Sequence, residues 1–187
     1  MAVVLFCEKG RIPMKIIIRR TTPSDAAALL EHLRQIGGET DNLSFGSEGL
    51  PFSIEDEMSF LEGIQNSTDH LMLLAIHDGK IIGDASLSRS PRRMSHRGDL
   101  GISVQQSHWN QGIGGMLMKE VIQFAKKNAY EVIDLQVRSD NHSAIHLYKK
   151  FGFKKIGTHP SFFKINNQNI SFDYMYLAFN ESNEVSL

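Results

Sequence analysis

Cysteine is nearly absent from this sequence, since Cys7 is the single one among 187 residues. An internal disulfide is therefore excluded, and this usage is typical of the reducing cytoplasm, where we expect the protein to reside. Long apolar runs are absent too, and none approaches the roughly 20 residues that a membrane-spanning helix needs. We therefore expect no membrane-spanning segment.

A surplus of either charge is also lacking. Lysine and arginine number 20, aspartate and glutamate number 21, and the formal net charge is −1. Such a balance gives no global polybasic signal for nucleic acid or an anionic membrane, so we expect neither as a partner. The hydrophobic share of 41% and the charged share of 22% are ordinary for a globular protein, and the length suits one domain with a full core.

The first 13 residues differ in character from the rest of the chain. The segment "MAVVLFCEKGRIP" has a short apolar patch with no basic residue before it, unlike a secretory signal peptide. A better start lies at Met14, where "MKIIIRR" indicates a β-strand. We interpret residues 1–13 as an N-terminal extension, which an initiation site assigned too far upstream would explain, and residues 14–187 as the domain.

Periodicity and turn residues predict alternating strands and helices. Thr22, Pro23 and Asp25 mark the start of the first helix, and the glycine pair 37–38 is expected to end it. Helices are expected at residues 22–36, 54–65, 112–128 and 141–151. Strands are expected at 15–20, 70–88 (two strands around Asp78-Gly79), 99–105, 131–138, 153–159 and 169–179, the last two pairing across "INNQN".

The order of strand 99–105, helix 112–128 and strand 131–138 implies a parallel strand pair with a right-handed crossover. The other connections suit antiparallel pairing. The sequence therefore predicts an α/β (α+β) domain with a mixed sheet that contains one parallel unit.

Three glycines fall within four residues where the third helix is expected to begin, in "HWNQGIGG", residues 108–115. Glycine costs a helix about 1 kcal/mol relative to alanine, so we expect a reason for the bare backbone. The first N–H groups of a helix lack intrahelical partners and the dipole is positive there. Gly112, Gly114 and Gly115 would therefore let a phosphate approach closely. The alternative is that they only permit tight packing of helix on strand.

Two common phosphate-binding loops do not fit these glycines. A P-loop requires Gly-Lys-Ser/Thr, whereas this chain continues Gly-Gly-Met-Leu. The dinucleotide fingerprint Gly-x-Gly-x-x-Gly requires a glycine where Leu117 stands. The loop therefore predicts a phosphate ligand of another kind.

Two segments together carry a family resemblance. "WNQGIGG" at a helix start resembles the acetyl-CoA pyrophosphate loop of the GNAT acyltransferases, Arg/Gln-x-x-Gly-x-Gly/Ala. About 30 residues later, "NHSAIHLYKKFGF" is similar to the family's Asn-x-x-Ala-x-x-Leu-Tyr-x-x-x-Gly-Phe. The order of elements matches from residue 15 to 179. The chain departs from the pattern at Trp109, which replaces the first Arg or Gln; its indole would either cover the cofactor or pack against the protein, and we favour packing.

The resemblance implies a GNAT fold, with a mixed, largely antiparallel central sheet, one parallel strand–helix–strand unit and flanking helices. It implies acetyl-CoA as co-substrate, with no metal. Loop amides 110–115 are expected to hold the pyrophosphate, and the strand before the loop the pantetheine arm. The expected cofactor-binding residues are Ile102, Val104, Trp109, Asn110, Gln111, Gly112, Ile113, Gly114, Gly115, Asn141, Ala144 and Tyr148.

Acetyl transfer to an amine needs an oxyanion donor, an acid for the leaving thiolate and a base for the amine. The resemblance assigns the backbone N–H of Val104 to the oxyanion. It assigns the acid to Tyr148, which an ordinary pKa of ~10 keeps protonated at neutral pH; a plain core tyrosine is the alternative. Asp99, acting through water, is our candidate base, with His96 and a water chain as alternatives. Asn141 also suits a helix N-cap.

In this family the first two helices and their loop usually wall the acceptor pocket. Here residues 31–62 contain eight acids against one basic residue, Arg34. An acidic mouth would attract a cationic amine, whereas solvated helix faces are the alternative. The acids are Glu31, Glu39, Asp41, Glu48, Glu55, Asp56, Glu57 and Glu62.

Three other groups of residues invite functional interpretations. Four arginines in residues 89–97 would contact RNA or an acidic protein, or form a solvated turn. His142 and His146 have a spacing that can bind metal, but no third ligand accompanies them, so we expect a solvated face. A late aromatic group would border the acceptor, form a homodimer surface or pack in the core: Phe162, Phe163, Phe172, Tyr174 and Tyr176.

These observations predict an acetyl-CoA-dependent N-acetyltransferase whose acceptor is a small cationic amine or a peptide amine. One alternative is a ribosomal-protein N-terminal acetyltransferase, which needs a groove open at both ends. Another is a catalytically inactive CoA-binding sensor or interaction module, and the presence of Tyr148 argues against it.

Overall fold

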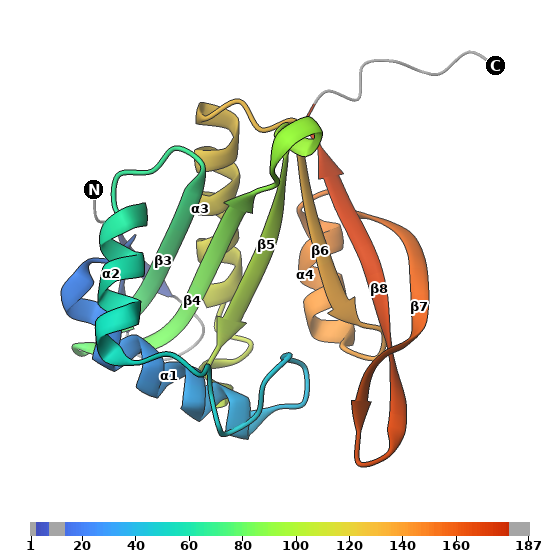
Figure 1. The fold of residues 1–187 in the computed structure, drawn as a ribbon, viewed down its shortest axis with the longest axis horizontal. Coiled ribbons are helices and arrows are strands. Elements are labelled where there is room, and N and C mark those ends of the chain that lie inside the picture. Colours follow the sequence, from blue (N-terminus) through green and yellow to red (C-terminus); the bar gives the residue numbers. More distant parts are fainter. Residues whose placement is uncertain (1–2, 8–13, 180–187) are drawn as a thin grey trace. The chain divides into compact units, whose positions relative to one another are not determined.

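The computed structural model describes residues 3–7 and 14–179, drawn as a ribbon in Figure 1. It divides into two compact units. The first runs through Leu87 and includes Gly101–Val121, and the second contains Ser88–Leu100 and the chain from Ile122 onward. The division falls inside strand β5 (Arg97–Val104) and helix α3 (Ile113–Lys127).

Eight strands form one sheet in the order β1-β2-β3-β4-β5-β6-β8-β7. Strands β5 and β6 pair in parallel, and the pairs β1–β2, β2–β3, β6–β8 and β7–β8 are antiparallel. This confirms the mixed, largely antiparallel sheet with one parallel strand–helix–strand unit. The remaining strands are β1 (Val3–Cys7), β2 (Met14–Arg20), β3 (His70–His77), β4 (Lys80–Arg89), β6 (Val132–Arg138), β7 (Lys154–Ile165) and β8 (Gln168–Ala178).

The segment that we interpreted as an extension contains a strand. β1 pairs antiparallel with β2, from Val3 opposite Ile18 to Cys7 opposite Met14. Residues 1–2 and 8–13 lie outside the described part of the chain. The backbone of residues 3–7 therefore continues the sheet beyond the first strand of the predicted domain.

Both expected hairpins have two-residue turns with positive φ. Asp78 and Gly79 have φ of 47° and 76°, and Asn166 and Asn167 have 48° and 63°, as the tightest hairpin turns require. Strand β7 extends to Ile165, beyond the expected residue 159. Irregular pairing between His159 and Phe163 accommodates the proline at 160, which lacks a ladder N–H.

The first helix runs farther than expected. A 3-10 turn, Pro23–Asp25, leads into α1 (Ala26–Glu39), which continues through the glycine pair where we expected it to stop. A Cβ at Gly37 would lie 2.0 Å from the carbonyl oxygen of Gly46. The glycine therefore serves the close approach of the following loop and does not end the helix. The other helices are α2 (Ile54–Ile64) and α4 (His142–Lys150), and none in the described part of the chain is long and apolar enough to cross a membrane.

The first unit buries an apolar cluster that includes Leu29 and Leu33 of α1, Leu61 of α2 and Leu74 of β3. Each fully buried leucine contributes about 1.5–3 kcal/mol relative to an exposed one. Neighbouring β4 residues point to opposite faces of the sheet. Asp84 contacts a histidine of α1, whereas a Cβ at position 83 would lie 3.5 Å from a leucine of α3. In the first unit, α1 and α3 therefore cover opposite faces.

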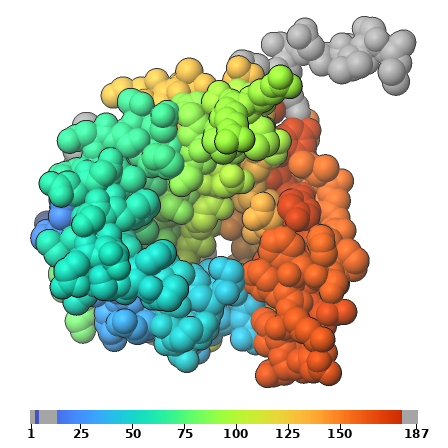
Figure 2. Space-filling view, in the orientation of Figure 1, coloured from blue at the N-terminus to red at the C-terminus, as the bar shows by residue number. Residues whose placement is uncertain are grey.

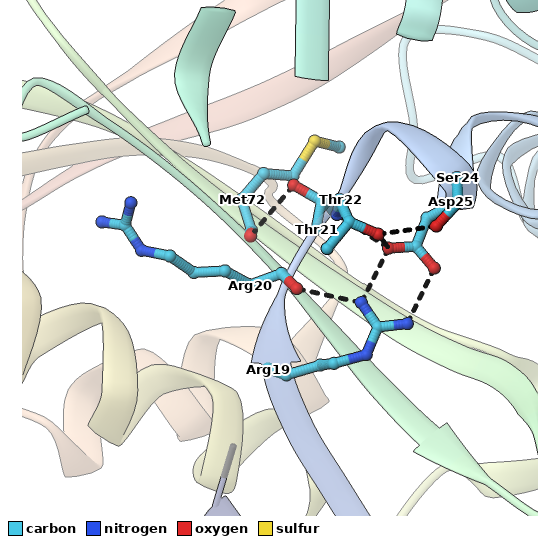
Figure 3. Close-up of polar contacts among 7 residues, drawn as sticks. All are labelled: Arg19, Arg20, Thr21, Thr22, Ser24, Asp25 and Met72. Atoms are coloured by element: carbon cyan, nitrogen blue, oxygen red, sulfur yellow. Dashed lines mark hydrogen bonds and ion pairs between the residues drawn. The ribbon is translucent and has the colours of Figure 1, made fainter. Parts of the chain in front are cut away.

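An ion pair joins the end of β2 to the start of α1 (Figure 3). The Arg19 guanidinium donates two 2.7 Å hydrogen bonds to the Asp25 carboxylate. The backbone N–H of Thr22 donates to the same carboxylate at 2.8 Å, in the predicted capping arrangement. The hydrogen bond from Arg19 is the largest cause that lowers the pKa of Asp25, to about 2.

In the second unit, β8 lies between β6 and β7 and carries the buried Asp173. Burial raises the pKa of this carboxyl, but hydrogen bonds from Lys155, Ser139 and Thr158, each 2.8 Å long, lower it overall. The carboxylate thus joins β7 and the segment after β6 to β8. All three contacts are made to Oδ1 of Asp173.

Candidate functional site

The glycine-rich loop ends in a helix start whose backbone is shaped for an anion. Asn110 and Gly112 both have positive φ, 59° and 83°. The Gly112 carbonyl accepts the N–H of Met116 at 3.1 Å and so makes the first helical hydrogen bond. The N–H groups of residues 113–115 consequently have no earlier helical carbonyl to donate to. Three amides at the positive end of the α3 dipole are the chemistry that a pyrophosphate would use.

Trp109 links this loop to the end of β5. Its indole Nε1–H donates to the Val104 carbonyl at 2.6 Å, and the residue is 40% exposed. Gln111 adds a 3.0 Å bond from its side-chain amide to the Ser107 carbonyl. The indole therefore contributes to loop geometry through a directional hydrogen bond, and the packing that we favoured for it stays a prediction.

The end of β5 presents backbone groups on the side away from β4. The N–H of Gln105 donates to the Ile82 carbonyl of β4 at 2.9 Å. Because successive residues of a strand direct their N–H groups to opposite edges, the amides of Val104 and Ile102 point the other way. The parallel pairing with β6 covers only residues 97–99 of β5. The geometry at Val104 is therefore compatible with the expected oxyanion donor.

In the second unit, Asn141 is the N-cap of α4, and its Oδ1 accepts the N–H of Ala144 at 3.1 Å. One helical turn on, the Tyr148 ring is 6% exposed and lies 5.8 Å from the Phe153 ring, between centroids. Burial raises the pKa of Tyr148. Within the described residues its hydroxyl forms no hydrogen bond, while every fully shielded side-chain polar atom there has a partner. The hydroxyl is thus uncommitted among the described residues.

The predicted base lies on the surface. Asp99 is exposed, near the start of β5, and accepts a 3.3 Å hydrogen bond from Ser90. Five residues of extended strand separate it from Val104, a span of about 17 Å. The alternative His96 is exposed as well. Asp99 and His96 therefore remain candidates for the general base on the grounds of the sequence alone.

Most of the acids between residues 31 and 62 are exposed, as expected for solvated helix faces. Figure 2 shows the outer face of α2 in teal, and Glu55, Asp56 and Glu62 of this helix are exposed. Glu57 is the exception, since it is 4% exposed and burial raises its pKa. Glu39 accepts the N–H of Gln106, after β5, at 2.7 Å.

The arginine loop is partly structural. Arg89 donates to the Asn128 carbonyl at 2.6 Å and lies 3.8 Å above the centre of the Tyr130 ring. Arg97 pairs with Asp134 at 2.8 Å, and this hydrogen bond raises the pKa of Arg97. Only the middle of the loop, around residues 92–93, remains as an exposed basic segment.

The two remaining candidate groups differ in placement. His142 and His146 are exposed, and in residues 3–7 and 14–179 no three acidic, histidine or cysteine side chains gather as metal ligands would. The aromatic rings pack on one another within the second unit, with Phe172 centred 4.3 Å from Phe163 and 4.8 Å from Phe162. They join β7 to β8, and a homodimer surface there stays a prediction.

Sequence reasoning missed a buried polar cluster in the first unit: His32, Asp84, Ser103 and Gln105. These residues come from three elements and the segment after β5, and are up to 73 positions apart. No local motif marks them, and only the apolar residues around Asp84 in β4 hint that its carboxylate is buried.

Comparison with known proteins matches this chain to one family. The sequence model of the acetyltransferase (GNAT) family matches residues 28–153. In solved structures, an acetyltransferase of the GNAT family from Streptococcus pneumoniae has a TM-score of 0.84 and 31% identity, covering 87% of this chain and 99% of that one.

Two curated relatives carry more specific names. The L-amino acid N-acetyltransferase AaaT of Escherichia coli K12 is 34% identical over 105 residues, 55% of this chain and 65% of that protein. The N-alpha-acetyltransferase RimI of Mycobacterium tuberculosis is 30% identical over 89 residues, 47% of this chain and 54% of that protein. The matches thus span about half to two thirds of these relatives.

Proposed function

This chain belongs to the GNAT acetyltransferase family, and from that premise we propose that it transfers an acetyl group from acetyl-CoA to a primary amine. The acceptor is a small cationic amine, an amino acid included, or a peptide amine. The observation that carries the proposal is the start of α3, where the left-handed Asn110 and Gly112 leave the next three amides free of helical carbonyls.

In this proposal the cofactor lies against backbone. Amides of residues 110–115 hold the pyrophosphate, and the outward groups of Ile102 and Val104 bond the pantetheine arm. The Val104 N–H stabilises the oxyanion that forms as the amine attacks the thioester. Asn141 adds a side-chain contact from the N-terminus of α4. No metal takes part.

Tyr148 is the proton donor for the leaving thiolate. Burial keeps its hydroxyl neutral at neutral pH, and the hydroxyl has no competing partner within the described chain. The same desolvation also raises the pKa of a thiol, so the leaving sulfur demands a proton more strongly there than in water. A buried tyrosine is thus matched to a buried leaving group.

The relatives favour two acceptor classes within one reaction. One relative is named for L-amino acids, and the other is an N-alpha-acetyltransferase. We place a free amino acid or related small amine first and a peptide N-terminus, including that of a ribosomal protein, second. The inactive CoA-binding module is the third candidate.

An acceptor panel tests these candidates. The protein is mixed with acetyl-CoA and one amine at a time, from polyamines, aminoglycosides, amino acids and N-terminal peptides, and released thiol is measured. Thiol release that saturates with one class, with the acetylated product identified by mass, supports the proposal. Thiol release no faster than hydrolysis with every class supports the inactive module.

A further inference from the structure

A chain of hydrogen bonds crosses the interior of the first unit and ends at β5. The Asp84 carboxylate accepts the hydroxyl proton of Ser103 at Oδ1, and the same oxygen lies 3.2 Å from His32 Nε2. Gln105 lies on the other side of the imidazole, 3.3 Å from Nδ1. His32, Asp84 and Gln105 are 3%, 8% and 9% exposed, whereas Ser103 is half-buried.

The neighbours of Gln105 orient its side-chain amide. Its side-chain nitrogen lies 2.9 Å from the Ile81 carbonyl and 3.1 Å from Gln35 Oε1, so it is the amide donor. On the other side of the imidazole, Nε2 faces Asp84 Oδ1, where an N–H would donate to the carboxylate. Asp84 Oδ1 thus has two polar neighbours, the Ser103 hydroxyl and the His32 imidazole.

Stability alone is a poor reason for this cluster. A buried carboxylate is expensive, and well-packed apolar residues often stabilise a core as well or better. Among the described ion pairs, Asp84 is paired with His32 and with no lysine or arginine. The hydroxyl that donates to this carboxylate belongs to Ser103, which is half-buried.

That hydroxyl is next to the proposed oxyanion donor. Ser103 precedes Val104, and consecutive Cα atoms are 3.8 Å apart. The Ser103 side chain lies on the same face of the sheet as Asp84, the face that α1 covers, because its hydroxyl donates to the Asp84 carboxylate. Asp99 lies four residues earlier along the strand, on the exposed surface. Of the two aspartates, Asp84 is connected to the reacting end of β5.

We propose that Ser103 accepts the proton of the acceptor amine while its own proton passes to Asp84, an inference that rests on the proposed function. As the amine nitrogen bonds to the acetyl carbon, one N–H proton moves to Ser103 Oγ and the Ser103 proton moves to Asp84 Oδ1. The C–S bond then breaks, and Tyr148 gives its proton to the thiolate. Asp84 returns its proton through Ser103 to water, and Tyr148 regains a proton from water. Ser103 is a catalytic residue, and Asp84 and His32 are positioning residues.

The test uses the acceptor that the panel identifies and measures kcat and both KM values. Ser103→Ala and Asp84→Asn are expected to lower kcat by about 10²-fold, with the KM for acetyl-CoA within about twofold of wild type. Ser103→Thr keeps a hydroxyl and is expected to recover most of the lost kcat. Ser86→Ala, a half-buried serine two residues beyond Asp84 on β4, is the matched control and should leave kcat unchanged.

A solvent isotope effect separates proton transfer from a structural defect. In the wild-type protein the amine proton and the Ser103 proton move as the C–N bond forms, so kcat is expected to be lower in D2O than in H2O. Ser103→Ala removes this relay, and its kcat should show a smaller isotope effect. An equal isotope effect in the two proteins would indicate a structural defect, and that result overturns the proposal.

Three further outcomes are decisive. Wild-type kinetics in Ser103→Ala overturns the relay while leaving the proposed function intact. A larger loss in Asp99→Asn than in Asp84→Asn likewise overturns it, in favour of the surface carboxylate. Absence of thiol release by the wild-type protein overturns the proposed function and the relay with it. If Asp84→Asn unfolds, Ser103→Ala carries the test, because its side chain is only half-buried.

Discussion

Tyr148 shows how one residue can pack in the core and still have a hydroxyl that is available as a proton donor. Its ring is 6% exposed and packs on Phe153, as a core tyrosine would. Buried hydroxyls usually find a partner, yet this one has none among the described residues. The core and acid interpretations of the sequence are therefore compatible, since packing fixes the ring and leaves the hydroxyl available.

Tyr148→Phe separates the enzyme from a binding module. The phenylalanine keeps the packing but removes the donor, so we expect kcat to fall about 10²-fold or more while the acetyl-CoA dissociation constant changes less than about twofold. Steady-state thiol release and titration calorimetry measure the two quantities. An unchanged kcat would remove Tyr148 from the mechanism.

The Arg19–Asp25 pair makes a prediction about acid stability. The folded-state pKa of Asp25, about 2, lies below its unfolded value of ~3.9. Its contribution to the free energy of unfolding is thus complete above about pH 4 and is lost as the pH falls through 2. Because Arg19 is about a third exposed, solvent screening reduces this contribution to roughly 1 kcal/mol.

Asp25→Asn should accordingly lower the free energy of unfolding by roughly 1 kcal/mol at pH 7 and by much less near pH 2. Urea denaturation at several pH values measures the difference from wild type. Asp56→Asn is the control, since Asp56 has the same capping position after Ser53 in α2 and no arginine among its described contacts. A pH-independent difference for Asp25→Asn would mean that the ion pair contributes nothing.

At the scale of elements, the loop before α3 differs from a plain helix start. Gly112 has a φ of 83°, and a Cβ there would meet no atom within 4 Å. The backbone conformation is therefore what requires glycine at this position, and a lack of space is not. The first amides of α3 depend on this turn for their direction.

Gly112→Ala should cost about 1–2 kcal/mol of stability through left-handed strain and weaken acetyl-CoA binding at least tenfold. Gly79→Ala is the matched control, because Gly79 also has positive φ, 76°, and open space around its Cα, but lies in the β3–β4 hairpin. It should lose similar stability and keep full affinity. Equal affinity of both variants in titration calorimetry would contradict the anion-site assignment.

At the scale of the whole molecule, binding of the cofactor should raise the thermal stability of the folded protein. A ligand that binds only the folded state at 100 times its dissociation constant adds about 2.7 kcal/mol, or roughly 5–10 °C in Tm for a chain of this length. We expect this shift with acetyl-CoA and a much smaller one with S-acetylpantetheine, which lacks the pyrophosphate. Differential scanning calorimetry provides the measurement, and no shift with acetyl-CoA would contradict the cofactor assignment.

Local signals in the sequence determined much of this protein. Turn residues located both hairpins, the glycines located the start of α3, and Asn141 was recognisable as a cap because capping needs only neighbouring residues. The two motifs, about 30 residues apart, were sufficient to indicate the family. Apart from the pairing of the two motifs, these features depend on contacts within a few residues.

Only the tertiary structure decided the features that depend on distant chain segments. Gly37 resembles a helix stop, yet Gly46 approaches it and the helix continues. Asp99 resembles a base by its place in a strand, whereas Asp84 becomes a candidate only because β4, β5 and α1 bring it to Ser103 and His32. Burial and hydrogen bonding between residues 19 to 52 positions apart leave no periodic pattern, and these are the terms that set the chemistry of a carboxylate.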